Sequence, residues 1–259
     1  MPVGNSDKGV GLWAGQISIG SDFLYQNIDW SHGAIPGELD PNGNLVGDHS
    51  GILSTYLYVP NVTIGLSNYL NLTFSQIIGN RYMDWGNSRK SIHHRSEGSH
   101  TDYENAIGGY LGDSRLILRY LAINTARGTG KRIFFGGGLV IPSNNTLTSD
   151  PFSLLDPNSL EDHRHFSMSE GVYKAILETQ FFIKRKYNPV FMGTFLVVEL
   201  PLHENKYGFK APRIIEVSFS SLTSKLRYVK SSLSFGLSIQ NSSLAYWNGI
   251  EAPNTQSTI

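Results

Sequence analysis

The chain has 259 residues, no cysteine and a formal net charge of zero, and only 16% of its residues are charged, against about 25% in typical soluble domains. The absence of cysteine excludes a disulfide framework, a thiolate metal site and a cysteine nucleophile. The sequence has no excess of Lys and Arg of the kind that nucleic-acid-binding proteins carry, so we expect no nucleic-acid partner.

Alternation of apolar and polar residues recurs along the chain and predicts β-strands, because successive side chains of a strand face opposite sides of a sheet. It is clearest at residues 232–240, where Leu233, Phe235, Leu237 and Ile239 alternate with small polar residues. In chain order, we expect strands at residues 11–27, 52–59, 62–66, 70–74, 114–124, 131–141, 171–186, 190–202, 212–220 and 225–240, and a short one near 246–247.

Short and long connections roughly alternate between these strands. Short links are expected at residues 67–68, 126–130, 187–189 and 222–224, and long polar loops at about 31–51, 80–105 and 142–168. Pro60 is expected to interrupt the strand pattern. Membrane β-barrels have short turns at one end and long loops at the other. No composition shift marks a linker, so we expect one all-β domain over residues 1–259, a single antiparallel transmembrane-type β-barrel of about 10–12 strands.

Strands with one apolar and one polar face fit either a soluble fold around an apolar core or a membrane barrel with apolar side chains toward lipid. Sparse charge and long strands favour the membrane barrel, because a membrane-spanning strand needs about 9–11 residues and strands of globular sheets have about 5–6. Aromatic residues near the predicted strand ends would form girdles at the membrane interfaces. They are Tyr56, Tyr58, Tyr69, Tyr82, Trp85, Tyr187, Tyr228, Tyr246 and Trp247.

In such a barrel the charged residues of the strands would face the lumen. The expected lumen-lining residues are Arg115, Arg119, Lys174, Glu178, Lys184 and Glu216. Charges of both signs suit a hydrated channel, but they also suit an interior in which the charges only satisfy one another. The sequence leaves both interpretations open.

Three segments, in order along the chain, resemble one family of bacterial membrane proteins. They are NVTIGLSNYLNL at residues 61–72, GGYLGDSRLILRY at 108–120 and FGGGLVIPS at 135–143. These are similar to the patterns YGLTDRLSL, GLGDLRLGLRY and GLGLSLPTG of the outer-membrane barrels of the MetA-pathway phenol degradation, or "transporter", family. The similarity covers about the middle half of the chain.

The resemblance implies an outer-membrane β-barrel that acts as a channel for small organic compounds, without identifying a substrate. Such barrels commonly end on a strand with a terminal aromatic residue, whereas this chain ends Gln-Ser-Thr-Ile at residues 256–259. We therefore expect a missing C-terminal strand or an atypical member of the family. Residues 1–8 contain no apolar core of a signal peptide, which predicts either a mature or truncated form or a protein that is not exported.

Histidines in two predicted loops offer imidazole ligands for a metal ion. They are His93, His94, His100, His163 and His165. Arginine residues lie beside or between them and no HExxH spacing occurs, so solvated loop side chains are favoured over a metal site. The sequence contains no G-x-S-x-G motif. We expect no enzyme activity, no cofactor and no metal.

The combined prediction is a porin-like channel in the outer membrane of a Gram-negative bacterium, with membrane lipid and small solutes as its partners. Small compounds would diffuse passively through a lumen whose Arg and Lys residues, with a few Glu, bias what enters. The alternative is a soluble β-sandwich or barrel that binds a ligand or carbohydrate through Tyr and Trp side chains.

Overall fold

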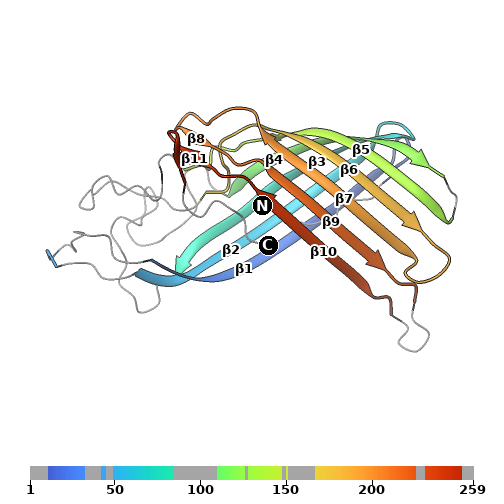
Figure 1. Cartoon of the computed structure of the whole chain (residues 1–259), viewed down its shortest axis with the longest axis horizontal. Coiled ribbons are helices and arrows are strands. Elements are labelled where there is room, and N and C mark those ends of the chain that lie inside the picture. The colour runs from blue at the N-terminus through green and yellow to red at the C-terminus, as the bar shows by residue number, and fades with distance from the viewer. Residues whose placement is uncertain are drawn as a thin grey trace.

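The computed structural model describes residues 11–32, 42–44, 49–84, 110–125, 128–147, 150, 167–225 and 231–252. Within these ranges the chain is all-β, and no helix is present that is long and apolar enough to cross a membrane. Nine strands form one antiparallel sheet in the order β1-β2-β3-β4-β5-β6-β7-β9-β10. The sheet curls into a half-barrel (Figure 1). The all-β, barrel-like fold expected from the sequence is confirmed.

The strands of the large sheet pair in chain order, except that β8 lies outside it. They are β1 (Ile17–His32), β2 (His49–Gly65), β3 (Leu70–Asp84), β4 (Leu111–Asn124), β5 (Gly130–Ile141), β6 (Lys174–Lys184), β7 (Phe191–Pro201), β9 (Ile214–Leu222) and β10 (Ser234–Ser242). As the first and ninth strands of an antiparallel series, β1 and β10 run in the same direction. No pairing joins these two edges within the described residues.

Connections of different length lie at opposite ends of the half-barrel. The β2–β3, β4–β5, β6–β7 and β9–β10 connections are each shorter than any of the β1–β2, β3–β4, β5–β6 and β7–β9 connections. Because consecutive strands are antiparallel, the first set meets at one end, called here the short-turn end, and the second set at the other, called the long-loop end. This is the alternation that the sequence predicts.

The expectation that Pro60 interrupts a strand is wrong, because β2 runs through it. Pairing of β2 with β1 is continuous, whereas pairing with β3 skips from Tyr58 opposite Ile78 to Asn61 opposite Ser75. Proline has no N–H to donate to a ladder and is tolerated where the ladder is interrupted. The residue that looked like a strand break therefore sits at a local irregularity inside one long strand.

Other strand bounds differ from expectation because pairing partners set them. β3 was expected to end at residue 74 but extends to Asp84, into the expected loop, since Ile52 of β2 is still available to pair there. β10 begins only at Ser234, opposite Leu222, where β9 ends. β1 begins at Ile17 and not at residue 11.

The alternation separates the two faces of the curled sheet. Exposed apolar side chains, between 38% and 59% accessible, cover the convex face at Leu116, Leu118, Leu139, Leu177, Leu196, Val217, Phe235, Leu237 and Ile239. Buried polar and charged side chains lie on the concave face at Asn61, Thr63, Asn71, Thr73, Arg119, Lys174, Glu178, Gln180, Glu199 and Ser218. Two buried apolar clusters share the concave face: Ile117, Val140, Ile176 and Val197, and Leu121, Phe134, Phe182 and Phe195.

A small second sheet lies at the long-loop end (Figure 1). Its strands are β8 (Phe209–Lys210), β11 (Tyr246–Trp247) and β12 (Ile250–Glu251), in the order β12-β11-β8. Trp247 is buried there with Ala245 and Ala252. Its expected place in an exposed aromatic girdle is therefore wrong.

The other aromatic residues divide between the strands and their ends. Tyr69 and Tyr187 are exposed in connections at the short-turn end, as a girdle requires. Tyr56 and Tyr58 lie well inside β2, away from its ends, because β2 is longer than expected. The side chains of Tyr82, Trp85 and Tyr228 lie outside the described part of the chain.

Candidate functional site

The centre of the concave face holds a bidentate ion pair. Arg119 of β4 donates from Nε to Glu178 Oε1 at 2.6 Å and from Nη2 to Oε2 at 3.0 Å. Both side chains are 1% exposed. The pair spans β5, where Gly136 is in register with both residues. A Cβ at Gly136 would lie 3.0 Å from Glu178 Oε1 and 3.4 Å from Arg119 Cγ, so the ion pair occupies the space of the missing side chain.

Uncharged side chains form further hydrogen bonds with this ion pair. Arg119 Nη1 donates to Thr73 Oγ1 at 2.9 Å, and the hydroxyls of Thr73 and Thr63 are 2.9 Å apart. Gln180 Nε2 donates to Glu178 Oε1 at 2.7 Å. The contacts extend from β2 to β6, and all five side chains are buried. Burial of such charges is tolerable only because each has an opposite charge and further hydrogen bonds.

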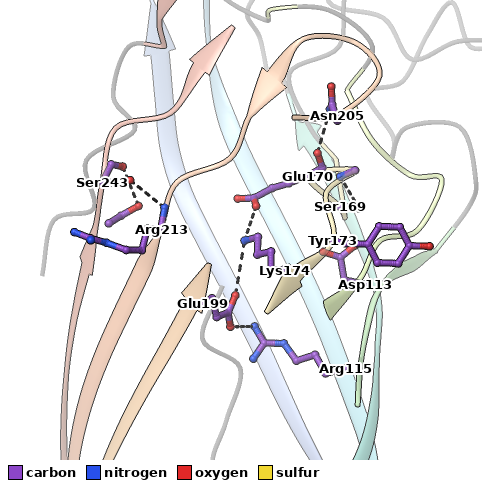
Figure 2. A network of polar contacts seen from close by, with 12 residues as sticks. Asp113, Arg115, Ser169, Glu170, Tyr173, Lys174, Glu199, Asn205, Arg213 and Ser243 are labelled. Carbon is purple, nitrogen blue, oxygen red and sulfur yellow. Dashed lines mark hydrogen bonds and ion pairs between the residues drawn. The ribbon is translucent and has the colours of Figure 1, made fainter. Parts of the chain in front are cut away.

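A second group of charges lies nearer the long-loop end (Figure 2). Glu199 of β7 pairs with Arg115 Nη2 through Oε1, and its Oε2 lies 3.7 Å from Lys174 Nζ. Lys174 Nζ also lies 2.5 Å from Glu170 Oε2. The buried apolar cluster around Ile117 separates this group from the central pair. Cations and carboxylates therefore alternate through the group.

Part of the β5–β6 connection packs against β3 and β4. Met168 is buried, and a Cβ at Gly79 would lie 2.8 Å from its Cε. A Cβ at Gly112 would lie 2.8 Å from the Met168 carbonyl oxygen. Arg81 Nη1 donates to the Ser167 carbonyl at 3.1 Å. Glycines at these two positions thus allow the connection to approach the strands closely.

The structure places four of the residues predicted to line a lumen in the two ion-pair groups: Arg119 and Glu178 in the central pair, and Arg115 and Lys174 in the second group. Glu216 is separate: its Oε1 accepts hydrogen bonds from the hydroxyls of Ser218 at 2.7 Å and Ser238 at 3.0 Å. Lys184 is exposed at the last position of β6, at the short-turn end. It is not part of either ion-pair group.

Sequence reasoning missed Glu199 and Glu170, the carboxylates that neutralise the second group. Glu199 could have been predicted from the sequence pattern, because it is the single charged residue of β7 and lies on the same face of the strand as Phe195 and Val197, which are buried. Glu170 precedes β6 and lies outside any strand pattern, so alternation could not find it. With both carboxylates present, the concave face is polar but closely balanced in charge.

The histidines considered as metal ligands lie outside the described residues. Within the part of the chain that is described, no cluster of three or more His, Asp or Glu side chains is placed to hold a metal ion. No family model matches the sequence, and no curated protein matches it significantly. The fold therefore stands on the structure, and the family resemblance stays a prediction.

Proposed function

We propose that the protein is a β-barrel channel of the outer membrane through which small organic solutes diffuse passively. The observation that carries this proposal is the distribution of side chains over the half-barrel. Its exposed convex face is apolar, at residues such as Leu118 and Leu177, and its concave face buries the charges of Arg119 and Glu178. Sheets of soluble proteins turn their apolar face to the core, whereas membrane barrels turn it outward to lipid.

Strand length supports the same proposal. β1 to β7 contain between 11 and 17 residues each. A tilted strand that crosses a membrane needs about 9–11 residues. The connections also have the asymmetry of outer-membrane barrels, with shorter turns at one end and longer loops at the other.

The ion pairs change the expected basis of selectivity. The sequence predicts a lining in which Arg and Lys bias entry, but Arg115, Arg119 and Lys174 each lie next to a carboxylate. A paired lining attracts ions of either sign only weakly, so solute size and hydrogen bonding would govern passage. The inward-packed Met168 would narrow the path near the long-loop end.

The experiment is to refold the full chain in detergent, compare the migration of boiled and unboiled samples on a gel, and then measure conductance in a planar bilayer. The proposal predicts a compact band that shifts on boiling, and a conductance with little preference between small cations and anions. A chain that stays soluble and monodisperse without detergent would refute the membrane proposal. A folded membrane barrel without conductance would refute the channel.

A further inference from the structure

A hollow at the long-loop end lies where the apolar convex face of β9 and β10 stops. The outward-facing positions are apolar at Val217 and Ile215 of β9 and at Ile239 of β10. They become polar at Arg213 on the first strand and at Asn241 and Ser243 on the second. The strands continue to pair at this level, since Ser243 N donates to the Arg213 carbonyl at 3.0 Å. The Arg213 N–H in turn donates to Ser243 Oγ at 2.9 Å. On these two strands, the transition ends the exposed apolar surface.

Among the described residues, two cations and no carboxylate line the hollow. It has a volume of about 720 Å³, and the described residues that line it include Lys210, Arg213 and Tyr246 and no acidic residue. Lys210 Nζ lies 5.7 Å from the centre of the Tyr246 ring. No ion pair of Lys210 or Arg213 is found among the described residues. Glu251 lies two strands from Lys210 across the small sheet and is not part of the lining.

The cations of the hollow differ from those of the concave face in having no carboxylate beside them among the described residues. Arg115, Arg119 and Lys174 are each neutralised by a carboxylate of the chain. Lys210 and Arg213 instead face a shared open space. Figure 2 shows Arg213 and Ser243 set apart from the ion pairs around Glu199. An anion from outside the chain would supply the missing charge.

We propose that this hollow binds the phosphate of an anionic lipid headgroup. The inference rests on the proposed function, since it requires lipid against the convex face. Headgroups lie immediately beyond the hydrocarbon layer, which we place where Ile215 gives way to Arg213 on β9 and Ile239 to Asn241 and Ser243 on β10. Arg and Lys at that level attract anionic lipids and form charge-assisted hydrogen bonds with phosphate oxygens. Tyr246 has the chemistry of an interfacial aromatic residue.

The test is a titration of the folded, detergent-solubilised full chain with phosphatidylglycerol, phosphatidylcholine and inorganic phosphate, with bound lipid counted by native mass spectrometry. Wild type is expected to bind phosphatidylglycerol more tightly than phosphatidylcholine. Lys210→Gln and Arg213→Gln should each weaken phosphatidylglycerol binding about fivefold, and the double variant about 25-fold. Lys184→Gln, which removes an exposed cation at the short-turn end, is the matched control and should bind as wild type does.

The inference is overturned if the double variant retains the affinity and lipid preference of wild type. It is also overturned if millimolar inorganic phosphate displaces the lipid, because the ligand would then be free phosphate. Boiled and unboiled gel samples of each variant separate this inference from the proposed function. A heat-modifiable, conducting protein without lipid preference refutes the lipid site alone, whereas a chain that needs no detergent refutes both.

Discussion

Removing the carboxylate of Glu178 should destabilise the protein strongly, because Arg119 would remain buried without its counter-charge. The pair makes two charge-assisted hydrogen bonds, of 2.6 and 3.0 Å, at 1% exposure of each side chain. Breaking a buried pair from one side costs about 3–5 kcal/mol. We expect Glu178→Gln to lose about this much unfolding free energy, and Glu216→Gln, whose carboxylate accepts hydrogen bonds only from hydroxyls, to lose far less.

The assay is urea unfolding of protein refolded in detergent, followed by tryptophan fluorescence and by the boiled and unboiled gel bands. The double variant Arg119→Met with Glu178→Met should recover at least about 2 kcal/mol relative to Glu178→Gln, because apolar replacement of both partners removes the buried charge. The reasoning is refuted if Glu178→Gln unfolds within about 0.5 kcal/mol of wild type, the usual range of neutral surface changes.

Three further predictions concern the same face. Gly136→Ala should lower the free energy of unfolding in urea by about 1–3 kcal/mol, because the added Cβ would overpack the ion pair. In the control Gly137→Ala, the added Cβ would meet only a carbonyl oxygen at 3.9 Å, so the unfolding free energy should change little. Equal losses in the two variants would contradict this prediction. Glu199→Gln should leave Lys174 with less negative charge nearby and make bilayer currents more anion-selective, and unchanged reversal potentials would count against it. Gly112→Ala should push the inward-packed β5–β6 connection away from the strand and further into the path, and so lower single-channel conductance. An unchanged conductance would show that the connection does not narrow the path.

The alternation in the sequence was enough to predict the all-β fold, the approximate strands and the asymmetry of the connections. It also placed Arg119 and Glu178 on one face, because each lies an even number of residues from buried neighbours on its own strand, β4 or β6. It could not show that the two side chains meet. That contact depends on register across β5 and on the absence of a side chain at Gly136, which are properties of three strands together.

The errors came from features that neighbouring strands control. Pro60 interrupts one ladder of β2 without ending the strand, and only the pairing with β3 shows this. Trp247 looked like a girdle residue but is buried in the small sheet, whose two-residue strands are too short to produce an alternation pattern. Lys184 shares the alternation of β6 with Lys174 and Glu178 but lies at the strand end, beyond the reach of the ion pairs.

The most direct test of the central claim is to ask whether neighbouring residues of one strand see lipid and water alternately. The chain has no cysteine, so Leu237→Cys and Ser238→Cys each provide a single labelling site. Both residues are exposed on β10, so burial does not distinguish them. In proteoliposomes, a fluorophore at residue 237 should emit as in an apolar medium and be quenched by brominated lipid. The cysteine at residue 238 should react with water-soluble thiol reagents, and a fluorophore attached there should be quenched by water-soluble quenchers. Equal aqueous accessibility at both sites would contradict the account.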